Sequence, residues 1–174
     1  MSTRADSPPS SCTCEVDRLL TRDDEFAIAP ARGGGWSAWA EAFTRLLDRL
    51  ASQAAHCVIV TQDPNQRYVQ LIIGHGHAHV EVSSNHYLMG EFRLDEREER
   101  LLEAIGFAPP AAVDGEATMP LNWWRNEEHF DAEMVAGLVL TVLTALTGFD
   151  PHRPVAVTVF GADRPCAACF WGAA

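Results

Sequence analysis

Residues 71–88, LIIGHGHAHVEVSSNHYL, hold four of the chain's seven histidines. His75, His77 and His79 alternate, and a continuous β-strand with this spacing would direct all three imidazole rings, which are common metal ligands, to the same face. However, a glycine on each side of His75 predicts a hairpin turn, because glycine adopts the positive φ angles of such turns. The turn interrupts the alternation and leaves only His79 well inside a strand, on the same face as Glu81. The pattern therefore favours polar hairpin residues over a metal site.

The five cysteines are the second group of side chains that could carry chemistry. Cys57 begins an apolar run and is most simply a small core residue. The other four form a CxC pair and a CxxC pair near the two ends of the chain: Cys12, Cys14, Cys166 and Cys169. Four thiolates can hold zinc and paired thiols can respond to redox conditions, although CxC is a less usual zinc spacing than CxxC. A metal- or redox-responsive protein that uses these four cysteines therefore stays open as an alternative.

Motifs of the common enzyme classes are missing from the sequence. It contains no GxSxG, no Walker A loop, no HExxH and no GxGxxG between a strand and a helix. Cys57 could be paired with a remote histidine as a nucleophile, but its apolar neighbours Val58, Ile59 and Val60 indicate burial instead. We therefore predict a protein that is not an enzyme and that uses no cofactor.

The charge balance excludes several classes of partner. The formal net charge is -11, from 24 acidic and 13 basic residues, and every basic residue is arginine. A negative field repels nucleic-acid phosphates. No apolar run reaches the about 20 residues that span a membrane, and the first residues lack the layout of a secretory signal. We expect a soluble, cytoplasmic protein with neither a nucleic-acid nor a membrane partner.

Hydrophobic periodicity divides the chain into three parts. Residues 1–34 are interpreted as a flexible leader, 35–161 as one α+β domain and 162–174 as a tail of uncertain order. Apolar residues at three- and four-residue steps predict helices at 36–55, 94–107 and 130–149. β-branched and alternating runs predict strands at 57–62, 67–74, 78–84 and 154–161. The expected fold is an antiparallel sheet, a meander of three strands plus a C-terminal strand, flanked by helices.

Two apolar features indicate contacts beyond the core. The third helix carries a wide apolar arc from Met134 to Leu146, which predicts burial or pairing with a second copy of the chain. Trp123 and Trp124 are adjacent, so in an extended segment they face opposite sides. Both can anchor a long loop, or one of them, together with Arg125, can recognise a partner, since Trp and Arg are favoured at interface hot spots.

The order of these signals resembles a known family. A leading amphipathic helix precedes a strand with Tyr68-Val69-Gln70, and the next strand runs into Ser84-Asn85 with Leu88. An acidic helix then ends in residues 102–107, and Asn122-Trp123 comes before the apolar third helix. Across about residues 36 to 160, this pattern is similar to the TY-Chap group of the type III secretion chaperone/YbjN-like superfamily, in its actinobacterial form.

The resemblance implies a compact α+β fold, often dimeric, that binds peptides without a cofactor. A protein of this kind would hold a client, such as a secretion substrate, in an extended and partly unfolded form. We assign partner binding to six residues of the matched segments and the Trp pair: Tyr68, Asn85, Tyr87, Trp123, Trp124 and Arg125. An immunity-type interaction module, which would bind a folded partner, is a further alternative.

Overall fold

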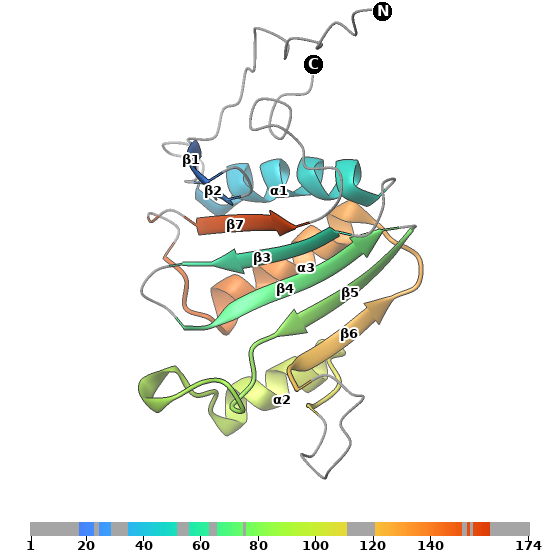
Figure 1. Cartoon of the computed structure of the whole chain (residues 1–174). Helices are drawn as coiled ribbons and strands as arrows, with labels where there is room; N and C mark the ends of the chain where they lie inside the picture. Colours follow the sequence, from blue (N-terminus) through green and yellow to red (C-terminus); the bar gives the residue numbers. More distant parts are fainter. Residues whose placement is uncertain are drawn as a thin grey trace, which may run out of the picture.

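The structure is a computed structural model that describes residues 18–22, 25–28, 35–51, 56–62, 66–74, 76–110, 121–150, 153 and 155–160. Its strands are β1 (Arg18–Arg22), β2 (Glu25–Ile28), β3 (His56–Thr61), β4 (Tyr68–Gly74), β5 (His77–Val82), β6 (Trp123–Glu127) and β7 (Val155–Phe160). Its α-helices are α1 (Gly35–Ala51), α2 (Glu96–Ala104) and α3 (Ala132–Ala145), and a short 3₁₀ helix spans Gly90–Phe92. The strands form one antiparallel sheet in the order β1-β2-β7-β3-β4-β5-β6 (Figure 1).

The α+β fold class expected from the sequence is confirmed. The meander of β3, β4 and β5 forms as predicted, α2 and α3 lie within their predicted helical segments, and α1 begins one residue before its predicted segment. The C-terminal strand β7 also forms, and it pairs with β3, the first strand of the meander. None of the helices in the described residues is long and apolar enough to cross a membrane.

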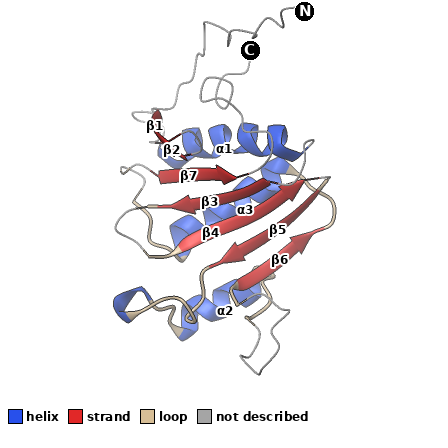
Figure 2. Ribbon diagram, viewed as in Figure 1, coloured by secondary structure: helices blue, strands red, loops and turns tan. Residues whose placement is uncertain are grey.

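Both long helices cover the same face of the sheet. Figure 2 shows α1 and α3 behind the strands and α2 beyond the β6 end, while no described helix lies in front. Along β4 the residues alternate accordingly, with Val69, Leu71 and Ile73 fully buried on the helix side. We call the opposite surface the open face, and the sheet register and burial pattern assign to it Cys57, Ile59, Thr61, Tyr68, Gln70, Ile72, His77, His79, Glu81, Trp124, Asn126, Ala156 and Thr158.

The core lies between the sheet and the two long helices. The helix α1 contributes residues at three- and four-residue steps, as its amphipathic sequence predicts. Its fully buried large side chains are Trp39, Phe43, Leu46, Leu47 and Leu50. The rings of Trp39 and Phe43 stack with centroids 4.7 Å apart. The apolar helix α3 contributes Val135, Val139, Val142 and Leu143 to the same core.

Arg67 ties α2 to the start of β4. Its guanidinium donates to both carboxylate oxygens of Glu98, with N–O distances of 2.7 and 3.0 Å. The same group donates to the carbonyl oxygens of Phe92, Arg93 and Leu146. A planar guanidinium suits this fork geometry, so one half-buried side chain connects three segments.

Specific residues define where α2 begins and ends. Asp95 accepts hydrogen bonds from the backbone N–H groups of Arg97 and Glu98, and Glu98 completes a capping box. Gly106, which lies just after the end of this helix, has φ +92°. That left-handed conformation is costly for residues with a Cβ atom.

Two parts of the sheet lie outside the four predicted strands. The strands β1 and β2 lie within residues 1–34, the expected leader, and the rest of that segment, like the tail 162–174, lies outside the described residues. These strands are short and charged, and β2 pairs with the distant strand β7, which no local pattern reveals. The Trp segment was expected to be extended, and in the structure it is the edge strand β6.

We predict opposite effects for alanine at two glycines. A Cβ atom at Gly106 would lie 3.1 Å from Nη1 of Arg125, in addition to the φ penalty, whereas at Gly137 in α3 it would meet nothing within 4 Å. Gly106→Ala should therefore lower the free energy of unfolding by about 1–2 kcal/mol. Gly137→Ala should raise it by about 1 kcal/mol, because alanine favours helix. Urea denaturation measures both, and a Gly106→Ala variant as stable as the parent would contradict the assigned backbone conformation.

Candidate functional site

A chain of hydrogen bonds crosses the open face from β4 to β6. Nδ2 of Asn122 lies 3.0 Å from the Tyr68 hydroxyl and 2.8 Å from Oε2 of Glu81. The other carboxylate oxygen of Glu81 lies 2.9 Å from Nε2 of His79. Nδ1 of His79 lies 2.6 Å from Oδ1 of Asn126. Five side chains are thus held in fixed orientations across three strands and the residue that precedes β6.

The sheet register explains why these side chains meet. His79 stands opposite Asn126, and Glu81 stands opposite Trp124, on the paired strands β5 and β6. Residues two apart on one strand share a face, which brings His79 to Glu81 as the sequence predicted. The imidazole of His79 also stacks near the ring of Trp124, with centroids 6.1 Å apart. We call the five hydrogen-bonded side chains the polar chain. The ring of Trp124 and the polar chain therefore form one continuous surface.

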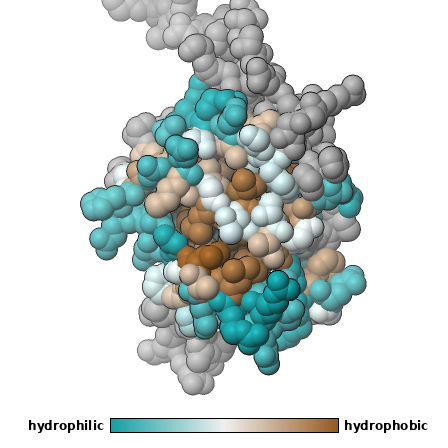
Figure 3. Space-filling view, turned by 180° about the vertical axis from the view of Figure 1, so that it is seen from behind, coloured by the Kyte–Doolittle hydropathy of each residue, from teal (hydrophilic) through white to brown (hydrophobic). Residues whose placement is uncertain are grey.

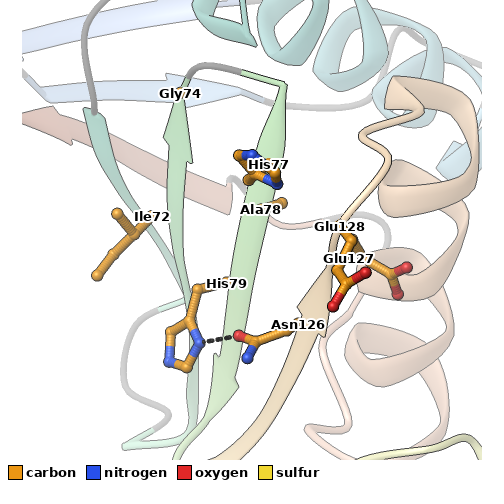
Figure 4. A pocket seen from close by; sticks show the side chains of 8 residues that line it. All are labelled: Ile72, Gly74, His77, Ala78, His79, Asn126, Glu127 and Glu128. Atoms are coloured by element: carbon orange, nitrogen blue, oxygen red, sulfur yellow. Dashed lines mark hydrogen bonds between the residues drawn. The ribbon is translucent and has the colours of Figure 1, made fainter.

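Apolar side chains and a pocket lie beside the polar chain. Ile72 is 44% exposed on the open face, which is unusual for a large aliphatic residue inside a central strand. A pocket of about 330 Å³ adjoins it, lined by Ile72, Gly74, His77, Ala78, His79, Asn126, Glu127 and Glu128. Figure 4 shows the side chains of His79 and Asn126 meeting across β5 and β6, with the two glutamates at the end of β6. The pocket thus combines an aliphatic side chain with imidazole, amide and carboxylate groups.

The six predicted partner-binding residues fall into two groups. Tyr68 and Trp124 lie on the open face and are half-buried, while Tyr87 is 50% exposed in the turn that follows β5. The other three are engaged inside the fold: Asn85, Trp123 and Arg125. The structure therefore brings Tyr68 and Trp124 to one surface and does not place the other three there.

Each of the three engaged residues has an internal partner. Asn85 exchanges hydrogen bonds with the backbone of Leu94, at 2.8 and 2.6 Å, ahead of α2. Trp123 is only 4% exposed, on the helix side of the sheet. Arg125 donates to the carbonyl oxygen of Ile105 at the end of α2. These contacts give the three residues structural roles.

Several open-face residues escaped the sequence analysis. Ile72 and Asn126 were not singled out, Asn122 was noted only in the motif Asn122-Trp123, and Glu81 was noted only as a neighbour of His79. The alternation in YVQLIIG and HAHVEV carried the missing signal, because every second residue of a half-buried strand faces away from the core. The sequence does not show which of the two sets the helices cover.

Two titratable side chains of the open face, Cys57 and Tyr68, have raised pKa values. Burial raises the pKa of the Cys57 thiol, and the Glu81 carboxylate raises it further. Since the thiolate is the reactive form, this environment works against a nucleophilic role. Burial also raises the pKa of the Tyr68 phenol, an increase partly opposed by its hydrogen bond with Asn122.

The metal alternative receives no support from the part of the chain that the structure describes. Those residues contain no group of three His, Cys, Asp or Glu side chains that could hold a metal ion. His75 and the four cysteines of the CxC and CxxC pairs (Cys12, Cys14, Cys166 and Cys169) lie outside the described residues.

Two asparagines of the polar chain should differ in their contribution to stability. Asn122 is buried and also accepts a hydrogen bond from the backbone N–H of Ser84, whereas Asn126 is exposed. Asn122→Ala should lower the free energy of unfolding by about 1–3 kcal/mol, because it leaves buried polar groups without partners. Asn126→Ala should change it by less than about 0.5 kcal/mol. Equal losses in urea denaturation would contradict the assigned hydrogen-bond chain.

Comparisons with known proteins agree with this fold. Residues 29–159 match the model of the TY-Chap3 family, described as T3SS (YopN, CesT) and YbjN peptide-binding chaperone 3. No match was found among curated proteins or among solved structures. The matched range runs from just after β2 to within β7, so it includes the open face and both long helices. Membership of such a family implies protein clients and a non-catalytic role. The chain belongs to the TY-Chap3 family of peptide-binding chaperones.

Proposed function

We propose that this protein holds an extended client segment, such as part of a secretion substrate, on the open face of its sheet. The observation that carries the proposal is that the exposed Ile72 of β4 and the half-buried Trp124 of β6 both lie on the face that no described helix covers. Exposing apolar surface of this kind to water costs free energy, and this cost is removed when a partner covers the surface. The membership of a peptide-binding family supports the same conclusion.

The polar groups of this surface are held in fixed orientations. Its amide, imidazole and carboxylate groups are held by one another, so little side-chain freedom is lost when a client binds. A client side chain can enter the pocket next to Ile72 while its neighbours lie along Trp124. The rigid arrangement thus favours an extended segment with apolar residues at alternate positions.

Charge determines which clients fit best. Glu128 is exposed at the pocket, and the formal net charge of the chain is -11. Among the described residues that line the pocket, the ionisable side chains are carboxylates and histidines. Complementary charge speeds association and discriminates against acidic partners. We therefore propose clients that carry arginine or lysine beside their apolar residues.

Two exposed apolar residues on opposite sides of the sheet provide a matched test. Ile72 on the open face is 44% exposed, and Met134 on α3 is 43% exposed. Fluorescence anisotropy with labelled twelve-residue peptides of alternating leucine and arginine measures the dissociation constant. Ile72→Ser should weaken binding about fivefold, which corresponds to about 1 kcal/mol of lost apolar burial. Met134→Ser should leave it unchanged.

Several outcomes would contradict this proposal. Equal effects of the two serine variants would remove the open face as the binding surface. Tighter binding of a leucine–glutamate peptide would remove the proposed charge preference. If no unfolded peptide binds and only folded proteins do, the immunity-type interaction module becomes the better account.

A homodimer formed through the helix-covered side is a further part of the proposal. Figure 3 shows an apolar patch on this side, and α3 presents the exposed Met134 and the half-buried Leu138 and Leu140. Pairing there would leave the open face free for a client. Light scattering at micromolar concentration should give the mass of two chains, and Met134→Glu should reduce it towards one. A monomer mass for the parent protein would remove the dimer.

A further inference from the structure

The first strands of the chain cover an edge of the sheet. β2 pairs with β7 in antiparallel register, with Glu25 opposite Thr158 at one end and Ile28 opposite Val155 at the other. β1 pairs only with β2 and is the outermost strand. The match to the TY-Chap3 family begins at residue 29, so the β1–β2 hairpin is an addition outside the matched range. Without it, β7 would be the edge strand.

We propose that the β7 edge is a strand-accepting surface for which the β1–β2 hairpin is an exchangeable internal occupant. An edge strand offers unpaired backbone N–H and C=O groups, and an extended segment binds them by main-chain hydrogen bonds. The hairpin meets the rest of the sheet through the four residue pairs between β2 and β7. A two-stranded hairpin is marginal by itself, so it depends on the pairing with β7 for its place in the sheet.

The pairing register between β2 and β7 indicates which residue pattern a competing strand needs. Phe26 stands opposite Val157 and Ile28 opposite Val155, and both valines are fully buried on the helix side. Ala27 stands opposite Ala156, on the open face. Residues directly opposite each other in a sheet share a face. The edge therefore fits a segment with large apolar residues at alternate positions and a small residue between them.

The opposite edge of the sheet is less suited to this role. The backbone of Trp124 in β6 pairs with that of Ala108, with N–O distances of 2.8 and 3.1 Å. This bridge occupies the second residue of a strand only five residues long, which leaves three residues after it. The β7 edge offers a longer stretch, since four consecutive residues of β7 pair with β2. The inference concerns this edge alone and does not rest on the function proposed for the open face.

Binding of the hairpin's own sequence as a separate peptide provides the test. The probe is a labelled peptide copy of residues 18–29, measured by anisotropy against three proteins: the full chain, a variant without residues 1–17 and a variant without residues 1–28. An attached strand competes at an effective concentration in the millimolar range. For a peptide with a dissociation constant of about 100 µM, the full chain should bind at least about tenfold more weakly than the variant without the hairpin. The variant without residues 1–17 is the matched control and should behave as the full chain.

A full-length variant keeps the test valid if the truncated protein does not fold. Phe26→Asp with Ile28→Asp places charge opposite the two buried valines and should release the hairpin. This variant should bind the parent peptide as tightly as the truncated protein, whereas a peptide with the same two substitutions should not bind. Equal binding by all the proteins, or binding by none, would overturn the proposal and leave the hairpin as a fixed cover of the edge. Ile72→Ser should not alter any of these values, which separates this result from the open face.

Discussion

One-sided burial of the sheet is the constraint on which the rest of the structure depends. The long helices α1 and α3 pack on a single face and take the alternate residues of β3, β4, β5 and β7 into the core. No helix in the described part of the chain covers the opposite residues of the same strands. Antiparallel sheets tolerate this arrangement when the second face is polar. Here that face is only partly polar, because Ile72 and Trp124 lie within it.

The hydrogen bonds of the polar chain hold the exposed side chains of the open face in fixed positions. Asn122 is buried directly before β6, and it connects Tyr68 with Glu81. From there the chain reaches His79 and Asn126. Buried amides that are fully bonded hold neighbouring groups in one geometry. The side chains of the open face are thus held in place in advance, which under the proposed function lowers the entropy that client binding costs.

Several residues show which features of the fold could be predicted from the sequence alone. The adjacent Trp123 and Trp124 predicted one ring inward and one outward, and β6 places them in this way. Asn85 and Arg125 appeared equally suited to a partner, but their side chains bind backbone of the same chain, which only tertiary structure reveals. The hairpin β1–β2 escaped prediction for a related reason: its pairing partner β7 lies more than a hundred residues away. Local periodicity specified the elements, whereas the choice of covered face and of neighbouring strands depended on packing.

Two neighbouring isoleucines allow the central claim to be measured directly. Ile72 faces the open surface and Ile73 faces the core, and Met134 lies on the helix side. Nuclear magnetic resonance of labelled isoleucine and methionine methyl groups can follow all three during addition of a binding peptide. The account predicts that the Ile72 methyl signal shifts most and that Ile73 and Met134 stay nearly constant. Shifts concentrated at Met134, with Ile72 unchanged, would contradict it.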